Sequence, residues 1–200
     1  MSDILSEREY FLVAGFGNPG REYRNTRHNV GFKLIDSLLL EFGARLSKMQ
    51  FKAMTGIVDR KNTRLILAKP QTFMNLSGQS VASLVRFYKI PLEKVLVAHD
   101  DIDLPLGSIR IRPGGGSGGQ KGLASTIEKL GTQEFPRMRI GIGRPSGTQE
   151  AAGYVLQEFS RSDEKVLTEV LATAVDAVKV FMDEGLEIAM TRFNGNVIKE

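Results

Sequence analysis

Histidines and strand-end carboxylates are the residues of this chain best suited to acid–base chemistry. His28 lies in the polar stretch Gly17–Asn29, and Asp100 follows an apolar run that ends in Ala98. Imidazole can accept a proton near neutral pH, and a buried carboxylate can orient it and stabilise its protonated form. The chain has no cysteine and no serine in a convincing nucleophile context. These residues predict hydrolysis by activated water, with His28 as base and Asp100 as its support, although a lone histidine and a strand-end aspartate are more often structural.

Two asparagines could complete such a site. Asn18 belongs to the same polar stretch as His28, and Asn75 stands where a helix is expected to begin. Asparagine at such places is commonly a turn or cap residue. If both side chains converge on His28, their amides can position a water molecule and a substrate carbonyl. Asn18 and Asn75 are therefore candidate catalytic residues.

Two glycine-rich segments match known sequence motifs but lack the structural context that each motif requires. Residues 15–20 fit G-x-G-x-x-G, but Pro19 and the polar residues after it delay the helix that a dinucleotide site requires. Residues 115–119 fit G-x-S-x-G, but both histidines precede this segment and no apolar strand leads directly into it. We therefore expect no nucleotide cofactor and no serine nucleophile.

Asp100, Asp101 and Asp103 leave a metal-dependent alternative open. Magnesium sites use one or two carboxylates together with substrate phosphate. These residues could therefore serve a magnesium-dependent phosphoryl-transfer enzyme, whereas hydrolysis by His28 requires no metal. Activity that persists in excess chelator would distinguish the two.

Positive charge is concentrated in one part of the chain. The net charge is +4, yet residues 104–149 carry seven basic and two acidic residues, so this segment has +5 and the remainder −1. A basic region on a nearly neutral body is typical of a protein that binds a phosphate-rich partner. The alternative is a surface that is merely basic.

The apolar pattern predicts one α/β domain, a mixed twisted β-sheet flanked by α-helices. No linker or repeat interrupts it, so we expect residues 1–200 to form a single domain with a core over about 10–194. The expected strands are 10–15, 53–59, 63–69, 94–98, 109–112 and 137–141, and the expected helices are 32–42, 75–88, 121–130 and 163–184. His28 and Asp100 then stand next to strand ends, where α/β sheets place their sites.

Composition also bounds the setting in which the protein works. No run of about 18 apolar residues is present, so no membrane span is expected. Met1–Glu9 is polar and acidic, unlike a secretory signal, and the lack of cysteine fits a reducing compartment. We expect a cytoplasmic protein that is a monomer.

Five blocks of the sequence resemble the signature blocks of bacterial-type peptidyl-tRNA hydrolases. The blocks are Gly17–Gly31, Lys69–Gly78, Val97–Gly107, Gly114–Gly122 and Arg139–Pro145. The similarity extends from about Phe11 to Asn194. It implies hydrolysis of the ester between a peptide and the 3′-terminal ribose of tRNA, which recycles tRNA from aborted translation.

The resemblance also implies roles for single residues. His28 would activate water with the support of Asp100, while Asn18 and Asn75 would hold the water and the peptide near the scissile carbonyl. Tyr23 and Met74 match positions that shape the pocket for the terminal nucleotide and the peptide, and we also expect Phe73 and Lys121 to contact the substrate or its tRNA. Arg112 and Arg139 match a basic pair for the 5′-phosphate of the acceptor stem, and Arg110 lies beside them.

One position departs from the family pattern. Members often carry His-Asn after the glycine pair of the loop, where this chain has Gln120-Lys121. An asparagine amide can accept a hydrogen bond and a lysine ammonium cannot, but Lys121 could contact a tRNA phosphate. The departure leaves open a second interpretation, an RNA-binding protein without hydrolytic activity. The presence of Asn18, His28, Asn75 and Asp100 favours the enzyme.

Overall fold

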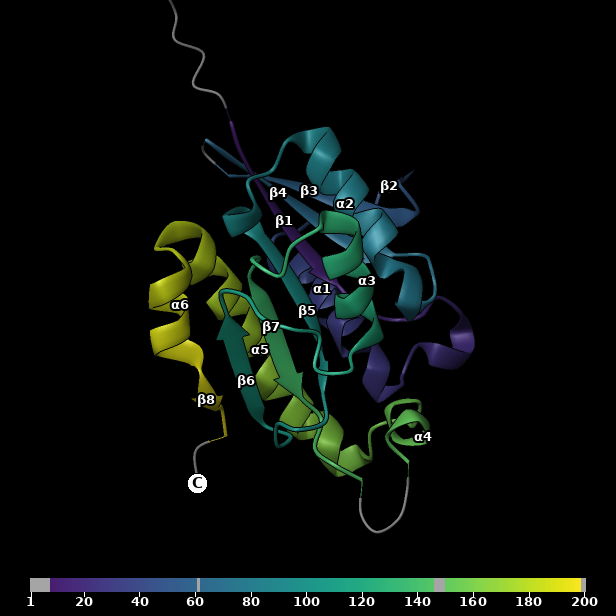
Figure 1. Cartoon of the computed structure of the whole chain (residues 1–200). Coiled ribbons are helices and arrows are strands. Elements are labelled where there is room, and N and C mark those ends of the chain that lie inside the picture. The colour runs from purple at the N-terminus through teal and green to yellow at the C-terminus, as the bar shows by residue number, and fades with distance from the viewer. Residues whose placement is uncertain (1–7, 61, 146–149, 199–200) are drawn as a thin grey trace, which may run out of the picture.

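The computed structural model describes residues 8–60, 62–145 and 150–198 (Figure 1). Most of the polar amino-terminal stretch and four residues of the basic segment, 146–149, lie outside the described residues. The centre is an eight-stranded sheet with the order β2-β3-β4-β1-β5-β7-β6-β8. Its strands are β1 (Glu9–Gly15), β2 (Lys48–Gln50), β3 (Ala53–Arg60), β4 (Thr63–Pro70), β5 (Val95–Asp101), β6 (Ser108–Arg112), β7 (Arg137–Gly141) and β8 (Gly195–Asn196).

The sheet is mixed, as the sequence predicts. Strands β4, β1, β5 and β7 are parallel, and the strands at both ends of the sheet join by antiparallel pairing. The helices are α1 (Val30–Glu41), α2 (Ser77–Tyr88), α3 (Lys121–Leu130), α4 (Ala151–Val155), α5 (Arg161–Asp183) and α6 (Leu186–Phe193). Short 3₁₀ turns add η1 (Arg21–Tyr23), η2 (Arg27–Asn29), η3 (Met74–Leu76) and η4 (Leu92–Lys94). Among the described residues, no helix is long and apolar enough to cross a membrane.

Two apolar cores cover the two faces of the sheet. On one face, residues such as Val13 of β1 pack with α1 and α5; on the other, residues such as Ala14 pack with α2 and α3. Because successive strand residues point to opposite faces, the central strands read as continuous apolar runs. Figure 1 shows α2 and α3 in front of the sheet and α5 behind it.

A pair of glycines sets where the functional loops lie. A Cβ at Gly15 would overlap the carbonyl oxygen of Gly31, and a Cβ at Gly31 would overlap the backbone of Phe16. Glycine at both positions lets the start of α1 approach the end of β1. The polar residues before α1 are thereby brought next to those that follow β1.

The structure extends one strand and adds short elements. β5 continues through His99, Asp100 and Asp101, which were expected just past its end, because these residues pair with Arg139–Gly141 of β7. Their polar side chains suggested that the strand ends before them, but β7 continues beside them and forms hydrogen bonds with their backbone groups. The elements β2, β8, α4 and α6 were not expected, since each is too short to show a clear apolar period.

Candidate active site

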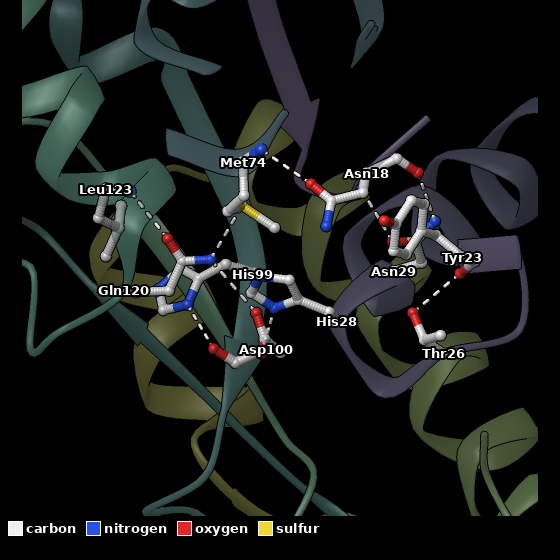
Figure 2. Close-up of polar contacts among 10 residues, drawn as sticks. All are labelled: Asn18, Tyr23, Thr26, His28, Asn29, Met74, His99, Asp100, Gln120 and Leu123. Atoms are coloured by element: carbon white, nitrogen blue, oxygen red, sulfur yellow. Dashed lines mark hydrogen bonds and ion pairs between the residues drawn. The ribbon is translucent and has the colours of Figure 1, made fainter. Parts of the chain in front are cut away.

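His28 and Asp100 meet at the carboxyl end of β5. His28 lies in η2, and its Nδ1 is 2.8 Å from Oδ2 of Asp100 (Figure 2). A carboxylate oxygen can only accept, so Nδ1 carries the proton and Nε2 of the neutral ring is left as a proton acceptor. The His28 side chain is 14% exposed and that of Asp100 is 4% exposed. The ring is therefore oriented by a buried carboxylate and accessible enough to meet a reactant.

The second oxygen of Asp100 contacts Gln120, a residue that sequence reasoning noted only as a family departure. The Nε2 of Gln120 lies 3.2 Å from Asp100 Oδ1 and 3.3 Å from the sulfur of Met74. Its Oε1 accepts the backbone N–H of Leu123 at 2.9 Å and caps α3. Glutamine is not a favoured cap residue, so no pattern in the sequence singled it out.

Asn18 is fixed by two neighbours. Its backbone N–H donates to Oδ1 of Asn29 at 2.9 Å, and Asn29 Nδ2 donates to the Asn18 carbonyl at 3.0 Å. Its own Oδ1 accepts the backbone N–H of Met74 at 2.8 Å, which leaves the amide nitrogen on the side of His28 (Figure 2). Asn18 therefore lies close to His28 and Met74. Asn29 was missed, although it belongs to the same polar stretch.

The structure does not bring Asn75 into this network. Asn75 lies in η3 and is exposed, and its side chain has no hydrogen-bonding partner among residues 8–60, 62–145 and 150–198. The preceding residue, Met74, is buried and makes the contacts to Asn18 and Gln120. Phe73 is 58% exposed beside it, and Tyr23 is partly buried in η1.

His99 supports the backbone of its neighbour. Its Nδ1 lies 2.7 Å from the Asp100 carbonyl oxygen and therefore donates to it. Burial lowers the pKa of His99 despite that bond, so the ring is neutral at neutral pH. Within the described parts of the chain its Nε2 is buried without a partner. His99 thus holds the strand that carries Asp100.

The carboxylates of the metal alternative have separate partners. Asp100 contacts His28, Asp101 pairs with Arg139, and Asp103 pairs with Arg144. Burial disfavours ionisation of Asp101, but the hydrogen bonds from Arg139 and the Asp103 backbone keep its pKa below the ordinary value. In the described ranges no three His, Asp or Glu side chains are grouped as metal ligands. Two of the three carboxylates, those of Asp101 and Asp103, are thus occupied by arginines.

Three arginines form a basic face on strands β6 and β7. Arg110 lies directly opposite Arg139, and Arg112 lies at the exposed end of β6. The alternate residues of both strands, such as Ile109 and Met138, belong to the core beneath α5. The arginines therefore point to the opposite face, as the alternation predicts. We call Arg110, Arg112 and Arg139 the arginine face.

Arg137 lies on the same face of the sheet but is buried, so one of the seven basic residues counted in segment 104–149 is not available at the surface. It is 2% exposed, and its guanidinium donates to the carbonyls of Gly115, Gly116, Gln133 and Phe135. The same group lies 4.3 Å from the centre of the Phe135 ring. Burial lowers the pKa of Arg137 below its ordinary value. This arginine holds the glycine loop to the sheet and offers no charge to a partner.

Arg27, which precedes His28, anchors η2 to a distant segment. It is 8% exposed, lies 4.7 Å from the ring centres of both Tyr154 and Phe159, and pairs with Asp163 at 2.8 Å. Burial opposes ionisation of Asp163, but hydrogen bonds from Arg27 and Ser160 hold its pKa below the ordinary value. Sequence reasoning missed this anchor because Arg27 and Asp163 are 136 residues apart.

Comparison with known proteins places these features in context. Residues 12–200 match the family model described as peptidyl-tRNA hydrolase. A peptidyl-tRNA hydrolase from Thermoanaerobacter sp. (strain X514) is 49% identical over 185 residues, which cover 92% of this chain and all of that protein. A chloroplastic peptidyl-tRNA hydrolase from Arabidopsis thaliana is 46% identical over 92% of this chain and 64% of its own length. The crystal structure of peptidyl-tRNA hydrolase from Acinetobacter baumannii has a TM-score of 0.86 at 34% identity, covering 98% of both chains.

Proposed function

Because the chain belongs to the peptidyl-tRNA hydrolase family, and so hydrolyses the ester bond of peptidyl-tRNA, we propose that His28 is the base that activates water. The family expectation drawn from the sequence blocks is confirmed over residues 12–200. The observation that supports His28 is its contact of 2.8 Å with Asp100, which leaves Nε2 free to take a proton. Asp100 acts by orienting the ring and stabilising the imidazolium.

The reaction then follows from these positions. Nε2 of His28 takes a proton from water as the water oxygen bonds to the ester carbonyl carbon, which gives a tetrahedral intermediate. The imidazolium returns the proton to the ribose oxygen as the carbon–oxygen bond breaks. The products are a peptide carboxylic acid, which then releases its proton to solvent, and tRNA with an intact terminal ribose.

Asn18 is the donor that we propose for the developing oxyanion. Its Oδ1 is already occupied by the Met74 backbone N–H, so its Nδ2 is the group left to donate. A fixed amide donor aimed at developing charge is a strong source of transition-state stabilisation. Asn75 is exposed two residues from Phe73, where substrate can reach both side chains. We assign Asn75, Phe73 and Tyr23 to contacts with the 3′-CCA end and the peptide, and the buried Met74 to shaping the pocket behind them.

We assign the arginine face to the 5′-phosphate and acceptor stem of tRNA. Arg139 pairs with His99 of β5, the residue that precedes Asp100, so the arginine face lies on the strand next to the one that carries Asp100. Arg110 and Arg139 lie in opposed register, and Asp101 neutralises only one of the two guanidinium groups. A phosphate placed between them can be bound bidentately. Arg112 and the exposed Lys121 can contact further phosphates.

Single-turnover hydrolysis of an N-blocked aminoacyl-tRNA in excess chelator tests this proposal. The His28→Ala variant should lose at least about 1,000-fold in rate while it still binds tRNA. Asn25→Ala is the matched control, because Asn25 is an exposed residue of the same polar stretch. A His28→Ala rate within twofold of wild type would remove His28 as the base. Wild-type protein that bound the tRNA and left the ester intact would restore the RNA-binding alternative.

We further propose that the chain acts as one monomeric domain in the cytoplasm. A single sheet runs through the described residues, and its edge strands β2 and β8 have only three and two residues, so they offer little for edge-to-edge pairing. The substrate is a product of ribosomes, which a cytoplasmic enzyme meets directly. Light scattering at micromolar concentration should give the mass of one chain, 22.1 kDa.

A further inference from the structure

We propose that Gln120 is a positioning residue, which holds Asp100 in place for His28 while it caps helix α3. The proposal rests on the roles of His28 and Asp100 given above. It also gives a purpose to the position at which this chain departs from the family pattern. Gln120 contacts neither His28 nor, in the reaction described, the substrate; it acts through the carboxylate.

The orientation of the Gln120 amide is fixed by its cap. A backbone N–H can only donate, so the amide atom that faces Leu123 N at 2.9 Å must be the oxygen. The amide nitrogen is therefore turned toward Asp100 Oδ1, 3.2 Å away, where a carboxylate can accept its proton. The hydrogen bond from Leu123 thus fixes the orientation of the amide, and with it the direction of the hydrogen bond to Asp100.

With this contact, both oxygens of Asp100 are held. Oδ2 accepts from His28 and Oδ1 accepts from Gln120. Removal of the Gln120 bond would free the carboxylate to rotate about its last torsion and would loosen the orientation of the His28 ring. The amide carries no charge and does not titrate, so its support is present at every working pH.

Gln120 also closes a ring of contacts around the site. Its Nε2 touches the sulfur of Met74, and the Met74 backbone N–H donates to Asn18. Asn18 is bonded to Asn29, which follows His28 in the chain. The base and the oxyanion donor are thus connected on both sides, and Figure 2 shows Gln120 opposite Asn18 across this ring. The members are Asn18, Met74, Gln120, Asp100, His28 and Asn29.

The length of the side chain explains why glutamine occupies this cap. Serine, threonine, aspartate and asparagine are the preferred N-cap residues, because their short side chains reach the N–H groups of the first turn. Glutamine has one more methylene than asparagine, and this extra length lets one amide serve both Leu123 and Asp100. An asparagine at position 120 should keep the cap contact with Leu123 but lose the hydrogen bond to the Asp100 carboxylate.

Two variants test the proposal against a structural role. Gln120→Asn should keep or raise the melting temperature and lower kcat about 10-fold, with KM within twofold of wild type. Gln120→Glu keeps the cap acceptor but sets a second carboxylate against Asp100, and should lower kcat roughly 100-fold at pH 7.5. Gln133→Asn, at an exposed glutamine outside the ring, is the control and should match wild type.

The pH dependence separates positioning from folding. As the pH falls, the two neighbouring carboxyl groups of the Gln120→Glu variant, that of Asp100 and the introduced one, come to share a proton, which restores an O–H donor. The ratio of the rate of this variant to that of wild type should therefore rise severalfold between pH 7.5 and pH 5.5. A structural defect would leave this ratio flat.

The outcomes are distinct. Wild-type kcat in Gln120→Asn, or a flat ratio for Gln120→Glu, overturns the role of Gln120. His28→Ala and Asp100→Asn are measured beside these variants. If they lose activity while the Gln120 variants do not, only this inference fails; if they retain full activity, the proposed function itself fails.

Discussion

The two functional regions of this protein are built in opposite ways. At the carboxyl end of β5, Asp100 is buried and Asn18, His28 and Gln120 are partly buried, and hydrogen bonds to neighbouring residues hold each of the four side chains. On the arginine face, Arg112 is exposed and Arg110 stands opposite another cation. The difference follows from the tasks: activation of water needs fixed geometry, whereas phosphate binding draws on charge that acts over several ångströms.

Arg137 and Arg139 show the same difference within one strand. They are two residues apart on the same face of β7, yet Arg137 is buried against carbonyl groups and Arg139 is partly exposed beside Asp101. Charge along a sequence therefore overstates the surface available to a polyanion. The number of hydrogen bonds that an arginine makes within the protein indicates whether it supports the fold or is available to bind a ligand.

The largest expected effect belongs to the rigid region. Asp100→Asn should lower kcat about 1,000-fold, since an amide can present its N–H to His28 and favour the wrong tautomer. KM and the salt dependence of tRNA binding should stay within twofold of wild type. Single-turnover rates, measured at two salt concentrations, give both KM and its salt dependence. A change in KM alone would show that Asp100 belongs to the binding region.

Arg137→Met should destabilise the protein by about 2–4 kcal/mol, since it removes the hydrogen bonds that a buried guanidinium makes to four backbone carbonyls. The salt slope of tRNA binding should not change. Chemical denaturation and binding titrations provide the two values. A reduced slope with normal stability would place Arg137 in the arginine face and erase the contrast with Arg139.

Arg139→Ala and Arg112→Ala should each weaken tRNA binding about 10-fold near physiological salt and reduce the salt slope by about one unit. The rate at saturating substrate should be unchanged. Arg45→Ala is a matched control, because Arg45 is exposed and lies outside the face. Binding titrations between 50 and 200 mM salt, roughly the range over which such contacts weaken, measure the slope. An unchanged slope would refute the phosphate role.

The smallest expected effect concerns the anchor of His28. The pKa of Asp163 is lowered in the folded protein, so its ion pair stabilises above the unfolded pKa of about 4 and is lost as pH falls through the folded value. Asp163→Asn should therefore cost about 1 kcal/mol at pH 7, and the difference from wild type should vanish in acid. Denaturation curves at several pH values measure it; a difference that does not depend on pH would contradict the ion-pair explanation.

Much of the architecture could be predicted because it depends on local patterns. Apolar runs and periods placed the central strands and four helices within a few residues, and alternation placed Ile109 and Arg110 on opposite faces. Short elements such as β2 and α4 were not predicted, since so few residues do not show a clear apolar period. The end of β5 was misplaced because backbone pairing with β7, rather than side-chain polarity, decides where that strand stops.

The sequence by itself determined the α/β class, the polar stretch that carries His28 and Asn18, and the family, because each is written in residues close together in the chain. Tertiary structure alone decided the partners. It joined His28 to Asp100 across 72 positions, placed Gln120 against the carboxylate and kept Asn75 outside the network. It also buried Arg137 while leaving Arg112 exposed. The reason is physical: a residue's local period sets the face on which it lies, but its role depends on which groups the fold brings within hydrogen-bonding distance of it.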